Sequence, residues 1–561
     1  MTSHPSWPSG YRNRHSGVRP RKLSNAAGGS KGRSLANGNA ASRTVSMSPS
    51  RIAPNPVPCN GYETHGRRGA AQGRPAYECE HLALAQEPLP RPSSFDRARG
   101  EFVCSATSCD PHRPDQAHGG RHVARLLIGH DVNEDLRLRR SSGTYAQRLL
   151  WFAQDGDVLV LPVAPDEAFA EHVTELTGTD MSTLRVVVPP PGKGSIGQLS
   201  RDRLRDPGFL EALRAATADK EIDLVSALWP DSRIVELAGV LGLESAVPGS
   251  GFLSQSGDAL ANSKAFFRTL AAGVGVPIAD GAVCLTRDVA RDTMCRLLGA
   301  GHPVILKHEF FSGGWGNDIV SLTVDFQPIG ATRMTVLAGL SGVETFLAER
   351  WGYLTDDGRH SLVVERYHPD STAAFAEFSI SDDGVALGGT GMLYSLPYVA
   401  SVLPASGISR AELDAVIAGA RLLCEAMRAI GYRGILGPDA IVTPDGEILF
   451  TEHNGRATGS THMYGVIGKK VIGPGFGKDR VIVDRQPTVP WSVASFREAA
   501  DRLRGSDIAF DPATRRGVML VQPFNVMTGS IPYVVVDDSV EVAIKTERLL
   551  GELFDFAPEI P

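Results

Sequence analysis

Residues 124–250 alternate between two spacings of apolar side chains. Four short apolar runs have the length and composition of buried strands, at 124–128, 157–163, 184–188 and 222–227. Each is followed by apolar residues three and four positions apart, as in amphipathic helices, at 145–153, 167–176, 207–216 and 232–241. Strands that alternate with helices in this way predict a small parallel sheet covered by helices.

The rest of the chain predicts a larger mixture of strands and helices. We expect strands at 303–306, 319–324, 361–367, 375–380 and 385–392. We expect helices at 264–273, 341–351 and 410–431. The last hundred residues predict a helix at 493–503, strands at 517–521 and 533–536, and a final helix at 540–553. The predicted fold class is therefore α/β, and α+β in part.

One predicted hairpin carries most of the candidate chemistry. Its strands, 436–442 and 448–450, are joined by a Pro-Asp-Gly turn. A hairpin folds Asp439 back toward Glu452, and the alternation of a strand places Glu452 and Asn454 on one face. Two carboxylates and an amide oxygen suit Mg²⁺ beside phosphates, so we predict these three residues as metal ligands.

Arg456 lies on the same face of the predicted strand as Glu452 and Asn454. Its fixed positive charge would stabilise a phosphoryl group during transfer. The alternative is an ordinary hairpin with a solvated polar end, and the hairpin alone does not separate the two.

Composition sets limits on the class of protein. The 561 residues are enough for three or four domains, and 42% hydrophobic with 21% charged residues is an ordinary soluble balance. The net charge of −6 argues against nucleic acid as the main partner. No apolar run approaches the ~18 residues that span a bilayer, and the first residues lack the apolar core of a secretory signal. We therefore expect a cytoplasmic protein with no membrane partner.

Residues 1–123 differ from the rest of the chain. They are rich in Ser, Gly, Pro, Asn and Arg, lack apolar periodicity, and contain 17 basic and 8 acidic residues. We expect a disordered extension that the fold does not need, with a basic arm for an anionic partner as the alternative. The seven cysteines form no C-x-x-C pair, which favours a reducing compartment. A zinc site at Cys104, Cys109 and His112 is the weaker alternative.

The run Gly192–Gly197, GKGSIG, fits the dinucleotide fingerprint G-x-G-x-x-G. Three prolines, Pro189 to Pro191, separate it from the preceding strand, so the chain cannot pass directly through a tight turn into a helix. We interpret this run as a flexible loop, and as one candidate lid over a substrate site.

A second glycine-rich run follows the strand at 303–306. Lys307 comes at the end of that strand, where its ammonium can contact the α- and β-phosphates of a nucleotide. The loop after it contains Ser312, Gly313, Gly314 and Gly316, and glycines let backbone N–H groups approach phosphate oxygens closely. This loop is the other candidate lid.

Taken in order, these motifs resemble the ATP-grasp superfamily over about 124–465. The resemblance rests on the α/β domain, Lys264 in N-S-K, Lys307 with its glycine loop, the strand ending at Glu365, Asp439, and the E-x-N-x-R run at 452–456. It implies an ATP-grasp fold with an N-terminal Rossmann-like pre-grasp domain and a C-terminal extension, using ATP and Mg²⁺. The implied parts are the extension 1–123, a pre-ATP-grasp domain 124–253, a core of 254–304 and 375–470, a lid subdomain 305–374, and a C-terminal lobe 471–561.

The resemblance also implies roles for individual residues. The implied nucleotide-binding residues are Lys264, Lys307, Ser312, Gly313, Gly314, Gly316, Glu365, Tyr367 and Asp370. Among these, Glu365 and Tyr367 would lie at the adenine base and Asp370 at the ribose hydroxyls. The implied catalytic residues are Arg456, Lys307, Gly459 and Ser460, of which the last two would hold the tetrahedral oxygen. Glu377 could approach the phosphates or the water shell of the metal, and His462 could serve as a base unless the amine arrives neutral.

Two stretches, NSKAFFR and TEHNGRATGSTHMYG, look most like the stand-alone peptide ligases of the pheganomycin type from actinobacterial antibiotic biosynthesis. That likeness implies an ATP-dependent C–N ligase that joins a guanidino-bearing, phenylglycine-like carboxylic acid to the amine of a peptide through an acyl phosphate. A homodimer is compatible with it. Two alternatives stay open: an ATP-grasp enzyme of another outcome, carboxylating or kinase-like, and a nucleotide-binding factor without turnover.

The expected disorder of the first part yields a test. Deleting residues 1–120 should leave both the activity and the melting temperature unchanged, because this segment contributes no side chains to the predicted core. Activity assays and thermal unfolding of the truncated protein check this. A collapsed melting temperature would contradict the interpretation.

Overall fold

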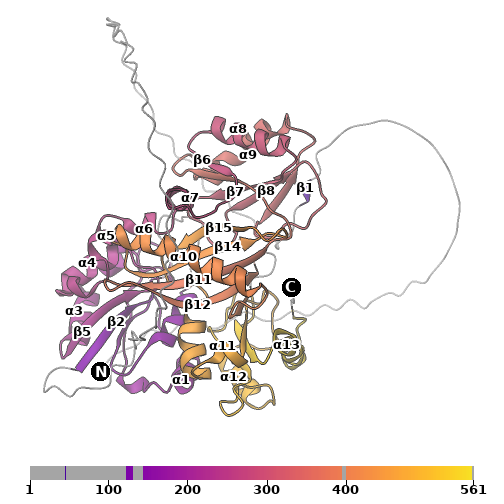
Figure 1. Ribbon diagram of the computed structural model, residues 1–561. Coiled ribbons are helices and arrows are strands. Elements are labelled where there is room, and N and C mark those ends of the chain that lie inside the picture. The colour runs from indigo at the N-terminus through magenta and orange to yellow at the C-terminus, as the bar shows by residue number, and fades with distance from the viewer. Residues whose placement is uncertain (1–43, 46–121, 131–142, 395–399, 559–561) are drawn as a thin grey trace, which may run out of the picture. The chain divides into compact units, whose positions relative to one another are not determined.

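The computed structural model describes residues 44–45, 122–130, 143–394 and 400–558, all within the unit Arg43–Pro561 (Figure 1). The expectations for residues 1–43 and 46–121, including the zinc alternative at Cys104, Cys109 and His112, lie outside the described residues. The expected disorder of 1–123 is wrong at residues 44–45, which pair with a strand at 333–336, and at residues 122–123, which begin a strand of the parallel sheet. The described strands form three sheets of four, six and eight strands.

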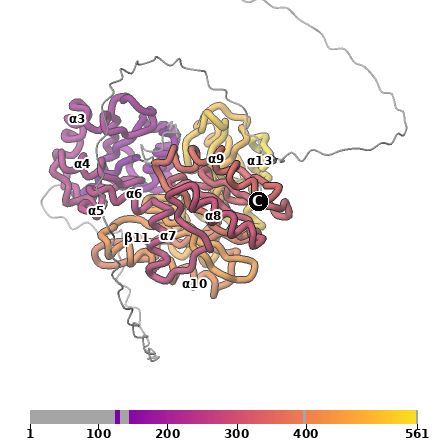
Figure 2. The backbone as a smooth tube through the Cα atoms, turned by 90° about the horizontal axis from the view of Figure 1, so that it is seen from above, coloured from indigo at the N-terminus to yellow at the C-terminus, as the bar shows by residue number. Residues whose placement is uncertain are grey.

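The four-stranded sheet is parallel, as predicted, with the order β4-β3-β2-β5. Its strands are β2 (His122–Ile128), β3 (Val158–Val160), β4 (Arg185–Val187) and β5 (Lys220–Ala227). The helices around it are η1 (Tyr145–Phe152), α1 (Glu167–Thr177), η2 (Met181–Thr183), α2 (Arg201–Leu204), α3 (Pro207–Thr217), α4 (Ser232–Leu241), η3 (Glu244–Ala246), α5 (Ser250–Ser254) and α6 (Gly257–Leu260). Helices α3, α4 and α5 group together on this part of the chain (Figure 2). The helix predicted at 145–153 is present as a 3-10 helix.

Helix starts follow from local sequence. The Asp166, Asp206 and Asp231 side chains each accept a backbone N–H in the first turn of α1, α3 and α4. Such caps satisfy donors that the helix leaves unpaired, typically at about 1 kcal/mol each. The core of this layer is an apolar cluster that includes Leu126 and Val225 from the sheet, both at most 1% exposed.

The six-stranded sheet has the order β1-β9-β8-β7-β10-β6. Its strands are β1 (Thr44–Val45), β6 (Gly281–Cys284), β7 (Val304–His308), β8 (Asn317–Ser321), β9 (Arg333–Val336) and β10 (Leu362–Arg366). Helices α8 (Arg287–Gly299) and α9 (Gly342–Thr355) pack on it (Figure 1). The sequence did not predict β6, β9 or α8, and β6 pairs with β10 although residues 281–284 fall in the stretch assigned to the core. Lys307 lies inside β7, not after it.

The eight-stranded sheet has the order β15-β14-β11-β12-β13-β16-β18-β17, with every neighbouring pair antiparallel. Its strands are β11 (Thr372–Ile380), β12 (Val385–Tyr394), β13 (Ala400–Leu403), β14 (Gly434–Val442), β15 (Ile448–Asn454), β16 (Val481–Arg485), β17 (Gly517–Leu520) and β18 (Tyr533–Asp537). The strands of residues 471–561 thus extend the sheet that contains the predicted hairpin. The division into domains otherwise stays a prediction.

Helices cover both faces of this sheet. Helices α7 (Lys264–Gly273) and α10 (Arg410–Ala429) pack on one face against residues such as Phe378 and Phe450. The other apolar cluster includes residues of η1 and α1 together with η4 (Met463–Ile472), α12 (Phe496–Arg504) and α13 (Val540–Phe554). A short helix, α11 (Phe476–Asp479), follows η4, which is a π-helix that the sequence did not predict.

The Gly192–Gly197 run is a loop, as predicted, but it is held firmly. The buried Arg203 guanidinium donates hydrogen bonds of 2.6–2.8 Å to the carbonyls of Pro162, Pro189, Pro190, Ile196 and Gln198. A side chain at Gly192 would come within 2.4 Å of Arg203 Cγ, so glycine is needed there for close packing. This network is evidence against a freely moving lid at 192–197.

Replacing Arg203 should therefore release this loop. We expect Arg203→Met to speed tryptic cleavage after Lys193, because five carbonyls lose their shared donor. The matched control is Arg201→Met on the same short helix, whose guanidinium is half exposed and pairs with Glu236. Equal cleavage rates in the two variants would contradict the role given to Arg203.

Candidate active site

The predicted carboxylates face each other across the hairpin. Asp439 on β14 pairs directly with Glu452 on β15, and Gly437 pairs with Asn454. Asn454 Nδ2 donates to Asp439 Oδ2 at 3.0 Å. The structure therefore brings together the three predicted metal ligands. Asp439 is on β14, and Glu452 and Asn454 lie within β15, not beyond the end of the strand as the sequence predicted. We call Asp439 and Glu452 the carboxylate pair.

Electrostatics make the two carboxylates unequal. Burial and the nearby Glu452 charge hold the pKa of Asp439 well above its usual range. Burial opposes the ionised form of Glu452 too, but the ammonium groups of Lys264 and Lys307 outweigh it and lower the pKa of Glu452. The pair thus gains from an added cation, and its oxygen donors with Asn454 fit Mg²⁺.

Two buried lysines are bound to carboxylates from other elements. Lys264, at the start of α7, contacts Glu452 Oε2 at 2.8 Å and donates to the Phe311 carbonyl. Lys307 contacts Glu365 Oε2 at 2.6 Å and donates to the Thr451 carbonyl at 3.3 Å. The lysines are each 6% exposed, so they carry positive charge in an interior where phosphates would be strongly attracted.

Glu365 has a second partner that the sequence did not indicate. Arg268 on α7 contacts Glu365 Oε1 at 2.5 Å, opposite to Lys307. The Tyr367 hydroxyl accepts the Ile329 N–H at 3.0 Å and donates to the Ile329 carbonyl. These side chains therefore have internal partners, and the predicted place of both residues at the adenine base stays a prediction. Asp370 is exposed in a turn with φ of 56°.

The predicted glycine loop joins β7 to β8. Gly313 and Gly314 have φ of 64° and 78°, which favours glycine, and a side chain at Gly314 would meet the Gly330 carbonyl at 2.8 Å. Tyr353 on α9 donates to the Trp315 carbonyl at 3.2 Å. Within the described residues, the N–H groups of Gly313, Gly314 and Gly316 make no internal hydrogen bond, which leaves them able to bind phosphate oxygens.

Arg456 is held by residues that the sequence analysis did not select. Its guanidinium donates to the Asn262 side-chain oxygen and lies 4.3 Å from the centre of the Trp229 ring. Trp229 follows β5 of the parallel sheet, and Ala457 N donates to the Leu228 carbonyl at 2.8 Å. The parallel sheet thus contributes a wall beside Arg456 and fixes where its charge can act.

Glu377 on β11 anchors the 457–464 loop that follows Arg456. Its carboxylate is fully buried and accepts hydrogen bonds from Thr458 at 2.7 Å, Thr461 at 2.8 Å and the Tyr464 hydroxyl. Burial raises the pKa of Glu377, against the three hydroxyls. The Glu377 carboxylate therefore holds the 457–464 loop in place. The three hydroxyl residues Thr458, Thr461 and Tyr464 are spaced three apart, and this spacing is the sequence feature that could have predicted the contact.

The remaining predicted catalytic residues lie in the same loop. Ser460 is 7% exposed, and its hydroxyl donates to Ser401 on β13 at 3.5 Å. His462 is fully buried between Trp151 and Phe152, and its ring nitrogens have no hydrogen-bond partner in the described part. Burial and the Arg148 charge lower the pKa of His462 to about 3, so it is neutral and shielded, which argues against its use as a base.

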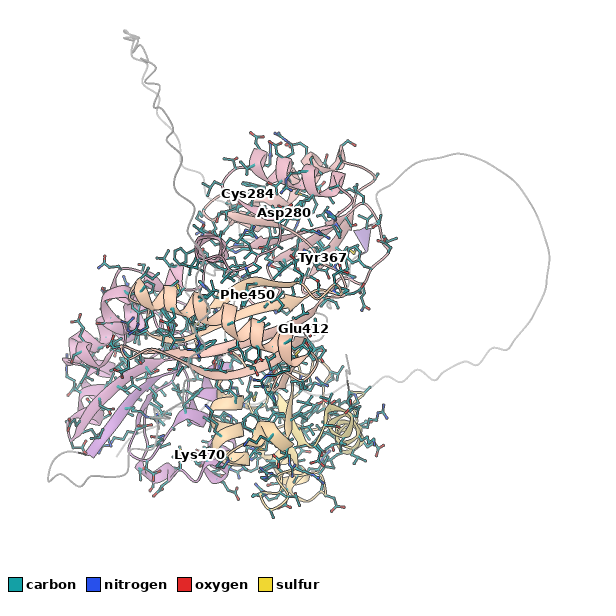
Figure 3. The ribbon with its side chains drawn as sticks, viewed as in Figure 1. Asp280, Cys284, Tyr367, Glu412, Phe450 and Lys470 are labelled. Atoms are coloured by element: carbon teal, nitrogen blue, oxygen red, sulfur yellow. The ribbon has the colours of Figure 1, made fainter. Side chains whose placement is uncertain are left out.

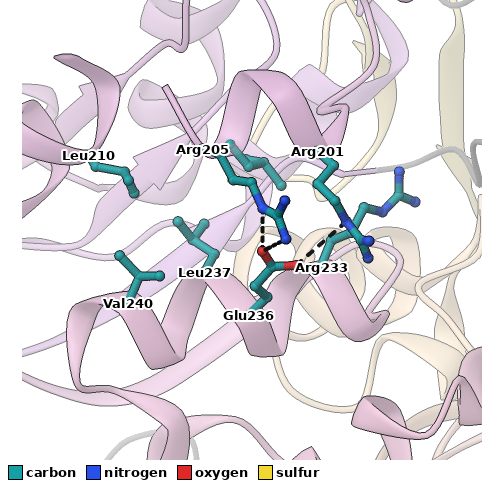
Figure 4. A pocket seen from close by; sticks show the side chains of 8 residues that line it. Arg201, Arg205, Leu210, Arg233, Glu236, Leu237 and Val240 are labelled. Atoms are coloured by element: carbon teal, nitrogen blue, oxygen red, sulfur yellow. Dashed lines mark hydrogen bonds and ion pairs between the residues drawn. The ribbon is translucent and has the colours of Figure 1, made fainter. Parts of the chain in front are cut away.

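A small pocket lies between α2 and α4, and none of the residues that line it belongs to the candidate active site (Figure 4). Arg201 and Arg205 line it and both pair with Glu236, which offsets one of their two positive charges. Its volume of about 20 Å³ holds about one water molecule, too little for a substrate.

Three of the seven cysteines lie in the described part, and all three are free. Cys284 is on β6, near Asp280 (Figure 3). Burial raises the pKa of the Cys284 thiol to about 11, and it raises the pKa of the Cys424 thiol further. In the same part there is no group of three or more His, Cys, Asp or Glu residues arranged to hold a metal. No helix there has the length and apolar character that crossing a bilayer requires.

Two family models match parts of the chain. The Pre ATP-grasp domain matches residues 146–243, and the PGM1 C-terminal domain matches residues 498–550. The first match covers most of the parallel sheet and its helices. The predicted α/β fold of the ATP-grasp type is confirmed, with the pre-grasp domain given by the first match and the C-terminal extension by the second. No curated protein matches the chain.

Several solved structures have a chain fold similar to that of this protein. N5-carboxyaminoimidazole ribonucleotide synthetase with ADP is 14% identical, with 78% of this chain and 97% of that chain covered and a TM-score of 0.47. Biotin carboxylase from Campylobacter jejuni, as a β,γ-ATP complex, is 15% identical, with 77% and 91% covered and a TM-score of 0.48. The biotin carboxylase domain of the Hydrogenobacter thermophilus 2-oxoglutarate carboxylase is 12% identical, with 78% and 91% covered and a TM-score of 0.49. Likeness at this level carries no information about substrate.

The carboxylate pair gives the sharpest test of the site. We expect Asp439→Asn and Glu452→Gln to abolish the rise in melting temperature that ATP with Mg²⁺ gives the wild type, since each removes an oxygen donor with its charge. Asp439→Asn without ligand should be no less stable than the wild type, because it removes a like charge.

The matched control is Glu447→Gln, an exposed carboxylate in the turn of the same hairpin. This variant should keep the full response to ATP and Mg²⁺, measured by thermal unfolding and by circular dichroism for the fold. A full response in Asp439→Asn or Glu452→Gln would remove the metal assignment.

Proposed function

We propose that the protein is an ATP-dependent carboxylate–amine ligase that forms an amide through an acyl phosphate. The single observation that carries the proposal is the carboxylate pair with Asn454, set beside two buried lysines from separate elements. Carboxylates and lysines packed this closely suit a ligand that carries both positive and negative charge. A nucleotide with Mg²⁺ is such a ligand, because the cation suits the carboxylates and the phosphates suit the lysines.

Asp439, Glu452 and Asn454 would hold the metal, whose donor set they fit. When bound, Mg²⁺ would neutralise charge on the phosphate oxygens. Lys264 and Lys307 would exchange part of their contact with Glu452 and Glu365 for phosphate oxygens, and the N–H groups of the glycine loop would bind further oxygens.

The chain's own residues then account for the two chemical steps. A carboxylate oxygen of the acid attacks the γ-phosphorus, the bond to the β-phosphate oxygen breaks, and ADP leaves. Arg456, which contacts Asn262 and Trp229, would stabilise the transferring group with its positive charge. The amine nitrogen then attacks the acyl carbon and phosphate leaves. The backbone of Gly459 and Ser460 would hold the tetrahedral oxygen.

We infer the substrate class from the sequence resemblance. NSKAFFR and TEHNGRATGSTHMYG look like the pheganomycin-type ligases, so we propose a guanidino-bearing, phenylglycine-like acid and the amine of a peptide, in natural-product biosynthesis. The match to the PGM1 C-terminal domain is compatible with a ligase that has an added C-terminal part. The use of ATP and the free thiols suit the cytoplasm.

The proposal predicts an ATP-dependent adduct. The protein with ATP, Mg²⁺, an acid pool that includes phenylglycine and its guanidino derivative, and a synthetic tripeptide should give a product of the summed mass minus water, with one ADP and one phosphate per amide. Mass spectrometry and phosphate release measure this, with Glu452→Gln as the inactive control and Glu447→Gln as the active one.

Two outcomes separate the alternatives. Phosphate release that depends on bicarbonate, without an amide, would replace the proposal with a carboxylating ATP-grasp enzyme. Nucleotide binding without ADP formation for any acid or amine would leave a nucleotide-binding factor.

A further inference from the structure

A second buried carboxylate lies along the same sheet, outside the metal site. Asp484 on β16 is 6% exposed and pairs in register with Ser401 on β13. The Ser401 hydroxyl donates to Asp484 Oδ2 at 3.2 Å. No ion pair to Asp484 is found in the described residues, since the adjacent Arg485 binds Glu547 at 2.6 Å instead.

This carboxylate is linked to the 457–464 loop by hydroxyl groups. The Ser460 hydroxyl donates to Ser401 Oγ, which donates in turn to Asp484. The first of these distances, 3.5 Å, is long for a hydrogen bond between hydroxyls, and such contacts often shorten when substrate binds. Both donors point toward the carboxylate, so the chain of hydroxyls has one direction.

This chain of hydroxyls provides a path for a proton, which the proposed second step needs. An amine that attacks an acyl phosphate gains positive charge and must lose a proton as the amide forms. Ser401, Ser460 and Asp484 are all more than nine-tenths buried, so water cannot collect that proton among them directly. His462, in the same loop, has no hydrogen-bond partner in the described part and a pKa lowered to about 3 by burial, so it is a poor acceptor. The Glu377 carboxylate already accepts hydrogen bonds from Thr458, Thr461 and Tyr464.

We propose that Ser460, Ser401 and Asp484 form a proton relay for the amine in the second step. The inference rests on the ligase function proposed above. As the C–N bond forms and the C–O bond to phosphate breaks, the amine proton passes to Ser460 Oγ. The Ser460 proton passes to Ser401 Oγ, and the Ser401 proton to Asp484 Oδ2. Asp484 acts through the two serines, so it is a positioning and proton-storing residue that does not touch substrate.

The surroundings of Asp484 suit this role. Burial raises the pKa of Asp484 to about 7, against the Ser401 hydroxyl and the Arg485 charge, which lower it. A hydrogen bond from the Gln486 side chain also lowers the pKa of Asp484. Tyr533 on the neighbouring strand β18 pairs in register with Arg485 and hydrogen-bonds Glu547, and burial raises the pKa of its phenol. Asp484 is therefore poised to accept a proton near neutral pH and release it afterwards.

The test separates the two chemical steps. Hydroxylamine in large excess traps acyl phosphates as hydroxamates, and a second hydroxylamine molecule can take the proton that the attacking nitrogen loses, whereas a dilute tripeptide amine depends on the protein for that transfer. We expect Asp484→Asn and Ser401→Ala to form hydroxamate from the phenylglycine acids at the wild-type rate. Amide formation with the tripeptide should fall by about 10²–10⁴-fold, the range of general acid–base catalysis.

A second readout is the pH dependence of amide formation. In the wild type, the rate should fall as pH drops through about 7, because a protonated Asp484 accepts no proton. Asp484→Asn should lose this part of the profile and keep the part that belongs to the amine. A merely structural role would lower the rate at every pH.

The matched control is Asp537→Asn, which replaces another buried carboxylate, 5% exposed, on the adjacent strand β18. It should leave the ratio of amide to hydroxamate unchanged. A wild-type ratio and pH profile in Asp484→Asn, or an equal loss of both products, would overturn the relay alone. Absence of hydroxamate with the wild type would overturn the ligase function and the relay with it.

Discussion

The structure depends on one electrostatic constraint, the opposition of Asp439 and Glu452 across a buried hairpin. Directly opposed residues in an antiparallel pair have Cβ atoms about 5 Å apart, and two like charges at ~4 Å repel by about 4 kcal/mol at an effective dielectric constant of ~20. The chain meets part of this cost with Lys264 on Glu452 and with a raised pKa for Asp439. An arrangement that is costly without a cation is evidence of a site shaped by its ligand and not by stability alone.

The rest of the site is placed around this pair by contacts between distant segments. Arg268 and Lys307 hold Glu365 from two sides, so the six-stranded sheet and helix α7 share a buried charge network. Glu377 fixes the 457–464 loop through three hydroxyls, and Asn262 with Trp229 fixes Arg456. These contacts fix the loop residues to side chains of the sheets, so the loop is held as rigidly as the strands. Little covalent work is required of the side chains, so positioning and charge account for the proposed catalysis.

Local sequence was sufficient for the hairpin, because its turn and its alternation are encoded within twenty residues. It was sufficient too for the parallel sheet, whose helices begin at their own caps. It failed where partners are far apart: the Glu365 carboxylate binds residues about 60 and 100 positions away, and Arg203 holds a loop that looked flexible. Strands of four or five residues such as β13 and β16 carry too few positions for a periodic pattern, so the extension of the sheet and Asp484 were not predicted.

The most direct test is a crystal structure of the protein with Mg²⁺ and a non-hydrolysable ATP analogue. The account predicts one or two cations held by oxygens of Asp439, Glu452 and Asn454, with Lys264 and Lys307 on the phosphates of the same nucleotide. A nucleotide bound elsewhere, or one bound here with no cation at the carboxylate pair, would contradict it.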